Sequence, residues 1–303
     1  KPQIHVENWG TYITTPKVSA NSAVCRIETS VADHSGTGKK ISVKTTIISP
    51  DGKQVAQKSA DIAIENGSGK AVQEFDIENP SLWDIDSPKL YTAKTQILAD
   101  GKPVDEYFSR FGVRSISYDR DGGFKLNGKK TIFKGVCMHH DLGPIGAAFN
   151  VSAARRQVEI LKEMGANAIR TSHNPPSPAL LDICDELGML VQVEAFDEWK
   201  MPKCENGYNK LFDKWAKKDL EAMIRRDRNH PCVVMWSIGN EVPEQTVPDG
   251  RKTAKFLAET ARAMDPTRPV TAGCDRNKQA VEYGFVDELD LVGFNYKPFY
   301  YKE

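Results

Sequence analysis

The chain has 303 residues, with 41 Lys and Arg against 41 Asp and Glu, so its formal net charge is zero. This balance argues against a surface that binds nucleic acid or a charged membrane, because both need clustered Lys and Arg. The length allows two domains with separate cores, and no apolar run of about 18 residues predicts a membrane span.

The chain begins at Lys1, without Met or a secretory signal, as an excised piece of a longer protein would. Its six cysteines are scattered without CxxC spacing, and most lie in apolar runs. We therefore expect neither a disulfide framework nor a zinc site.

Residues 1–115 alternate apolar and polar positions in several short runs. Cys25, Ile27 and Val31 show this period of two, which is typical of a half-buried strand. The same period recurs in three later runs: residues 41–47, 75–77 and 91–97. Asp51-Gly52 and Asp100-Gly101 are hairpin turn signals. About seven short strands in a segment of this length predict a β-sandwich.

From Ile116 the pattern changes to alternating helices and strands, so a second domain over residues 116–303 is predicted. A hairpin with turns at Gly122-Gly123 and Asn127-Gly128 leads into it. The predicted helices span residues 152–164, with Ser152 as N-cap, then 178–187, 212–227 and 249–264. The predicted strands begin at Ile132, Ala168, Leu190, Val233, Val270 and Leu291.

Repeated strand–helix units predict a parallel sheet with right-handed crossovers. A (β/α)₈ barrel usually needs about 250 residues, more than residues 127–303 provide. We therefore expect an incomplete barrel of about six strands, roughly two units short, in which open edges and an uncovered core lower the stability.

The stretch 227–244 contains the most informative strand. Its apolar run, residues 233–238, could be buried on both faces, and His230-Pro231 ends the helix before it. Asn240 and Glu241 follow the run, where parallel barrels gather their chemistry. From this pattern alone, Glu241 is either a functional carboxylate or a loop cap.

Polar side chains end the other predicted strands as well. They are His139, His140 and Asp141; Arg170 and His173; Glu194, Asp197 and Glu198; and Asn295 and Tyr296. Each alone could be a structural residue, but one ring of loops would collect them over a single pocket.

The run RNHPCVVMWSIGNE, residues 228–241, resembles the acid/base signature of family 2 glycoside hydrolases. KGVCMHHD and RTSHNPP resemble the first- and second-strand motifs of that family. WGTYITTP, SPKLYTAKTQI and RFGVRSI resemble its immunoglobulin-like domain, which precedes the barrel. The resemblance covers essentially the whole chain and implies a retaining β-glycosidase with a carbohydrate substrate.

The resemblance also assigns roles to site residues. Glu241 would be the general acid/base, and Asn240 would hold the 2-hydroxyl of the sugar. The sugar subsite would be lined by His139 and Asp141, while Arg170 would support the nucleophile. The remaining predicted substrate contacts are His173, Glu198 and Tyr296.

Two features depart from an intact enzyme of this family. The family nucleophile is a Glu on a seventh strand that this chain lacks, and Glu194 and Glu198 lie on the wrong part of the ring to replace it. We therefore expect the chain alone to be inactive or nearly so. Magnesium-dependent β-galactosidases carry a Glu and a His after the third strand, where this chain has Glu198 and Lys200. No cofactor is expected, and magnesium is doubtful.

The glycone stays open between β-galactoside, β-glucuronide and β-mannoside. HHD at residues 139–141 differs from the HED common in glucuronidases, and no Lys pair for a uronate is evident, which favours β-galactosidase. A periplasmic or secreted location would suit a longer parent protein that degrades polysaccharides. This longer protein, here called the full-length parent, could form a homo-oligomer. Two other classes compete: a non-catalytic carbohydrate-binding module, and a metal-dependent hydrolase built on His139, His140, Asp141 and His173.

Overall fold

The structure is a computed structural model and describes residues 1–297. The chain divides into two compact units. The sandwich unit comprises residues 1–132 together with the short segments 185–188 and 228–231, and the barrel unit comprises the other described residues.

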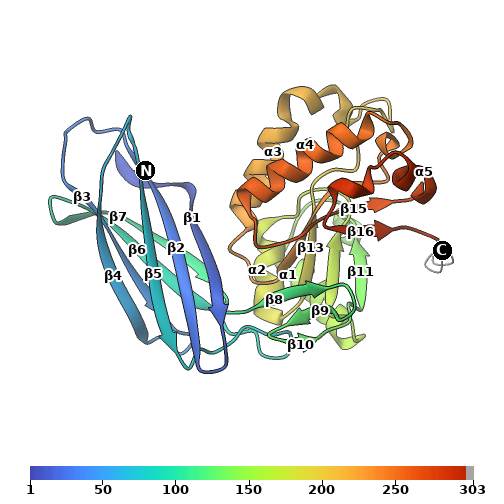
Figure 1. Cartoon of the computed structure of the whole chain (residues 1–303). Coiled ribbons are helices and arrows are strands. Elements are labelled where there is room, and N and C mark those ends of the chain that lie inside the picture. Colours follow the sequence, from blue (N-terminus) through green and yellow to red (C-terminus); the bar gives the residue numbers. More distant parts are fainter. Residues whose placement is uncertain (298–303) are drawn as a thin grey trace. The chain divides into compact units, whose positions relative to one another are not determined.

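Two antiparallel sheets form the sandwich unit (Figure 1). One sheet has the order β1 (Ile4–Val18), β2 (Ser22–Asp33) and β5 (Ser68–Glu78). The other has the order β4 (Gln54–Ile62), β3 (Ile41–Ile48), β6 (Tyr91–Ala99) and β7 (Lys102–Phe111). The predicted β-sandwich is confirmed.

The alternating residues that predicted these strands form the core between the sheets. Cys25, Ile27 and Val31 are fully buried. The hairpins β3–β4 and β6–β7 turn at Gly52 and Gly101, which both have positive φ, a conformation that glycine adopts without steric cost. A smaller sheet follows in the chain, made of β8 (Ile116–Asp119), β9 (Gly123–Leu126) and β10 (Lys129–Lys130).

The barrel unit contains a parallel sheet whose six strands pair in chain order. They are β11 (Gly135–Met138), β12 (Ala168–Thr171), β13 (Leu190–Glu194), β14 (Val233–Asn240), β15 (Val270–Cys274) and β16 (Leu291–Phe294). The helices between them are α1 (Val151–Glu163), α2 (Pro178–Leu187), α3 (Phe212–Asp227), α4 (Gly250–Met264) and α5 (Asn277–Glu282). The predicted incomplete barrel of about six strands is confirmed for the described residues.

Three local predictions differ from the structure. The first barrel strand begins at Gly135, and Ile132 is 70% exposed instead of starting the strand. Asn150 caps α1, because its side chain accepts a hydrogen bond of 3.0 Å from the N–H of Ala153, so the cap is not Ser152. The short helix α5 was not predicted.

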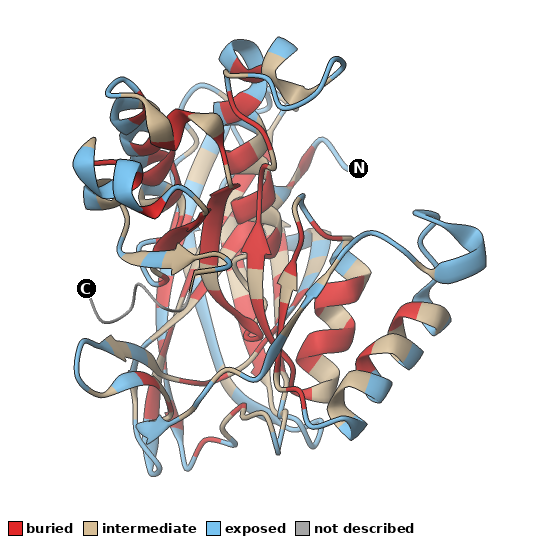
Figure 2. Cartoon of the chain, turned by 90° about the vertical axis from the view of Figure 1, so that its right-hand side faces the viewer, coloured by how far each residue is buried: buried red, intermediate tan, exposed pale blue. Residues whose placement is uncertain are grey.

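Burial is greatest in the central strands of the barrel unit and decreases toward its edges. All residues of β14 are buried except Met235, whereas the edge strands β11 and β16 are partly exposed (Figure 2). One face of the sheet borders a cavity of about 240 Å³, lined in part by Cys137, Arg170, Gln192 and Met235. Among residues 1–297, no helix combines the length and apolar character needed to cross a membrane.

Candidate active site

A buried carboxylate organises the polar residues at the C-terminal ends of β12 and β13. Glu194 has no exposed side-chain surface. Its Oε2 accepts hydrogen bonds from Nε and Nη2 of Arg170, at 3.0 and 2.7 Å, and from the hydroxyl of Ser237 at 2.5 Å. Its Oε1 lies 2.6 Å from Nδ1 of His173. Because a carboxylate only accepts, Nδ1 of His173 carries the proton in this contact and Nε2 is left for other partners.

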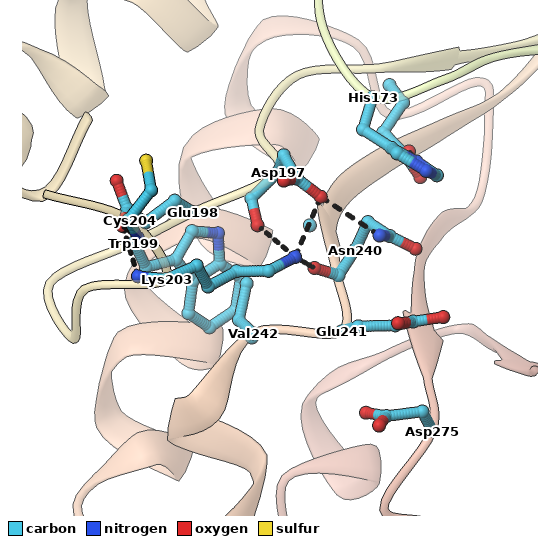
Figure 3. A network of polar contacts seen from close by, with 12 residues as sticks. His173, Asp197, Glu198, Trp199, Lys203, Cys204, Asn240, Glu241, Val242 and Asp275 are labelled. Atoms are coloured by element: carbon cyan, nitrogen blue, oxygen red, sulfur yellow. Dashed lines mark hydrogen bonds and ion pairs between the residues drawn. The ribbon is translucent and has the colours of Figure 1, made fainter. Parts of the chain in front are cut away.

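The side chain of Asn240, which is 3% exposed, is fixed from three directions. Its Oδ1 accepts from Nη2 of Arg170 at 2.8 Å and from Nδ2 of Asn295 at 3.3 Å. Its Nδ2 donates to Oδ1 of Asp197 at 3.0 Å, as Figure 3 shows. These partners come from three other strand ends, so the amide has one orientation, set by charged neighbours.

Glu241 follows directly and has a positive φ of 47°. Its N–H donates to the carbonyl oxygen of Gly273 at 2.8 Å, and its Oε1 accepts from Nδ2 of Asn295 at 2.7 Å. A hydrogen bond with Glu241 raises the pKa of the Tyr296 hydroxyl. The carboxyl group is therefore held by side chains that follow β16.

Asp197 stands beside Asn240 and carries an ion pair. Its Oδ1 lies 2.8 Å from Nζ of Lys203. Although burial opposes the shift, hydrogen bonds from Lys203 and Asn240 hold the pKa of Asp197 below its usual value. At neutral pH this carboxyl is an anion at the rim of the site.

The two predicted site residues that follow β11 have different surroundings. The ring of His139 meets the ring of His173 edge-on, with centroids 5.1 Å apart. The carboxylate of Asp141 accepts the N–H of Gly143, and Asp141 lines a small cavity together with apolar residues such as Leu142. The sugar contacts predicted for His139 and Asp141 stay predictions.

Glu198 has a different placement from the other predicted site residues. It is 4% exposed. Its Oε1 accepts the N–H groups of Lys203 and Cys204, and its Oε2 accepts that of Asn209 at 3.0 Å. Burial acts in the opposite direction, but these N–H groups hold the pKa of Glu198 below its usual value. The structure thus gives Glu198 a role in its own loop, and contact with a sugar stays a prediction.

The structure brings together five of the predicted residues: Arg170, His173, Asn240, Glu241 and Tyr296. Sequence reasoning missed what joins them. Glu194 ends an apolar strand, which signals a polar group at the correct edge of the sheet, but nothing in the sequence indicates that it binds Arg170, His173 and Ser237 together. Lys203 carried no sequence signal at all.

Two family models match the chain. The model described as "Glycosyl hydrolases family 2" matches residues 4–114, and "Glycosyl hydrolases family 2, TIM barrel domain" matches residues 119–297. The chain is 40% identical to the β-galactosidase BoGH2A of Bacteroides ovatus, over 97% of this chain and 38% of that protein. A putative β-glucuronidase of Formosa agariphila is 35% identical, over 94% and 25% respectively.

Solved structures agree with these matches. A glycosyl hydrolase family 2 member from Bacteroides cellulosilyticus superposes with a TM-score of 0.93 at 39% identity, covering 97% of this chain and 38% of that chain. The β-glucuronidase of Bacteroides uniformis gives a TM-score of 0.84 at 29% identity, covering 97% and 37%. The chain therefore spans about two fifths, or less, of the length of these relatives.

Proposed function

Because this chain belongs to glycosyl hydrolase family 2, we propose that it carries the acid/base half of a retaining β-glycosidase. The observation that carries the proposal is the placement of Asn240 and Glu241 at the end of β14. Glu241 there is held at 2.7 Å by Asn295, beside the buried cluster of Arg170, Glu194 and His173.

In this mechanism Glu241 protonates the departing glycosidic oxygen and later removes a proton from the attacking water. Its carboxyl can do this only if its direction is fixed, and the contacts with Asn295 and Gly273 supply that. Asn240 has a second amide hydrogen besides the one that binds Asp197. That hydrogen donates to the 2-hydroxyl of the sugar.

A retaining enzyme needs a second carboxylate, about 5–5.5 Å from the first, as the nucleophile. Glu194 is enclosed by Arg170 and His173, and Glu198 is bound to its own loop. Neither can attack an anomeric carbon from these positions. We therefore expect the nucleophile to come from a part of the parent protein beyond these residues, and the 303-residue chain alone to give no turnover.

The proposed substrate is a β-galactoside, because one relative is named a β-galactosidase and is 40% identical over nearly the whole chain. β-Glucuronides are the alternative, since other relatives are named β-glucuronidases, and β-mannosides come third. The test is a panel of nitrophenyl β-glycosides with the full-length parent. Turnover confined to the galactoside supports the proposal, and turnover confined to another sugar replaces it.

No resident metal is proposed. The position that would supply a magnesium ligand is Glu198, whose Oε1 already accepts two N–H groups and whose Oε2 accepts a third, and the nearby Lys200 is a cation that pairs with Asp213. A non-catalytic carbohydrate-binding module remains the competing class. It predicts sugar binding without turnover by the full-length parent, unchanged by Glu241→Gln.

A further inference from the structure

The loop at residues 199–211, here called the Lys203 loop, is built around a buried carboxylate. Glu198 accepts the N–H groups of the consecutive residues Lys203 and Cys204 and that of Asn209 further along the loop. A Cβ at Gly207 would lie 1.7 Å from Oε2 of Glu198, so only glycine leaves room for this carboxylate. On its other side, the loop donates the N–H of Met201 to Oε1 of Glu244 at 2.7 Å.

These contacts fix the backbone of the Lys203 loop without using the side chain of Lys203. That side chain instead extends to the end of β14, as Figure 3 shows. Its Nζ donates to Oδ1 of Asp197 at 2.8 Å, to the carbonyl oxygen of Asp197 at 3.0 Å, and to the carbonyl oxygen of Asn240 at 3.2 Å. All three donors of the ammonium group therefore have an acceptor.

The third contact involves the peptide group that joins Asn240 to Glu241. Its carbonyl oxygen accepts from Lys203, and its N–H donates to the carbonyl oxygen of Gly273 at 2.8 Å. The two contacts hold opposite ends of one peptide plane. The φ of Glu241 is +47°, which a residue with a side chain adopts at a cost and keeps only when its surroundings fix it.

We propose that Lys203 is a positioning residue, which holds the Asn240–Glu241 peptide so that the carboxyl of Glu241 faces the leaving group. This inference rests on the proposed acid/base function of Glu241. Without the ammonium group, the peptide loses its partner on the carbonyl side. The Glu241 carboxyl then spends less time in the orientation that protonates the glycosidic oxygen.

The alternative is a purely structural role, in which Lys203 only neutralises Asp197 and stabilises the fold. A readout specific to protonation separates the two roles. Hydrolysis of a 2,4-dinitrophenyl β-glycoside needs little protonation of its leaving group, whereas hydrolysis of a phenyl β-glycoside depends on it. The ratio of kcat/KM for the two substrates reports the first chemical step, and it does not change when part of a preparation is unfolded.

The experiment compares Lys203→Met, Lys203→Arg and Glu241→Ala in the full-length parent. Lys210→Met is the control, because Lys210 belongs to the same loop and its exposed side chain donates to Oδ1 of Asn206 at 2.9 Å, a residue of that loop. We expect Lys203→Met to lower phenyl-glycoside hydrolysis about tenfold more than dinitrophenyl-glycoside hydrolysis. Lys203→Arg, which keeps the charge and its donors, should restore part of the ratio, and Lys210→Met should leave it unchanged.

The possible outcomes separate the positioning role of Lys203 from the acid/base role of Glu241. A loss of equal size on both substrates in Lys203→Met, including a complete loss on both, overturns the positioning role and leaves a structural one. A normal ratio in Glu241→Ala instead overturns the proposed acid/base function. A changed ratio in Glu241→Ala with a normal ratio in Lys203→Met removes only the inference about Lys203.

Discussion

Nδ2 of Asn295 lies 2.7 Å from Oε1 of Glu241, although the two residues follow different strands with β15 between them. Gly273 on β15 makes this contact possible. A Cβ there would lie 2.8 Å from Nη2 of Arg170, 3.1 Å from Oδ1 of Asn240 and 3.2 Å from Nδ2 of Asn295. Because residue 273 has no side chain, the guanidinium of Arg170 and the amides of Asn240 and Asn295 can approach one another beside it.

Gly273→Ala should therefore lower activity more than stability. The added methyl group displaces Asn240 and Asn295 by a few tenths of an ångström, and a small misplacement of catalytic groups can cost about tenfold or more in rate. The measurement is kcat/KM of the full-length parent. The matched control is Gly135→Ala on β11, where the new Cβ meets nothing nearer than 3.4 Å. Equal activity in both variants would contradict this prediction.

Glu194→Gln should lower the stability of the fold as well as the activity. Glu194 is the buried partner of Arg170, whose side chain is 16% exposed. Removing the negative charge of Glu194 takes away the anion that this guanidinium pairs with. Breaking such a pair typically costs about 3–5 kcal/mol. Thermal unfolding of the full-length parent measures this cost. Glu106→Gln removes an exposed partner of Lys94, an ion pair that solvent screens, and should change the free energy of unfolding far less than Glu194→Gln does.

The contribution of Glu198 to stability should depend on pH. Because folding lowers the pKa of Glu198 below its ordinary value of 4.5, the unfolded state binds its proton more readily than the native state. The stabilisation is therefore complete well above pH 4.5 and is lost as the pH falls through the lower native pKa. Glu198→Gln should lower stability by about 2 kcal/mol at pH 7.

The measurement for Glu198 is the difference in unfolding temperature between the wild-type protein and Glu198→Gln across a pH series. The difference should shrink as the pH falls below 4.5. A penalty that stays constant from neutral to acidic pH would show that the charge of Glu198 contributes nothing to the loop.

Removal of divalent metal should leave activity unchanged. Glu198 is occupied by N–H donors, and Lys200, which follows it closely, pairs with Asp213 at 2.8 Å. The measurement is kcat/KM of the full-length parent after dialysis against EDTA, with and without added magnesium. A loss that magnesium reverses would mean that the Glu198 carboxylate rearranges to bind the ion.

Much of the fold was predictable because burial imposes simple periods on the sequence. The alternation at Cys25, Ile27 and Val31 requires a strand with one buried face, and the bounds of residues 178–187 and 212–227 matched α2 and α3. Prediction failed where an apolar residue is exposed, as at Ile132, and where Asn150 rather than Ser152 formed the helix cap.

The candidate site was predictable only in part. The sheet register determines which strand ends meet, so Arg170, Asn240 and Glu241 could be placed on one edge of the sheet from the sequence. Contacts such as Lys203 to Asn240 depend on the path of a loop, and no local pattern encodes that path. The enclosure of Glu194 likewise needs side chains from the two neighbouring strands β12 and β14, which only the folded chain brings together.

The most direct test of the central claim is chemical rescue of Glu241→Ala in the full-length parent. On a 2,4-dinitrophenyl β-glycoside, we expect the variant to stall at the covalent intermediate for lack of a general base. Azide should then restore turnover and yield a β-glycosyl azide, because a small anion can attack without proton removal. Wild-type rates in the variant, or a rescue that yields the α-azide, would contradict the assignment of Glu241 as acid/base of a retaining β-glycosidase.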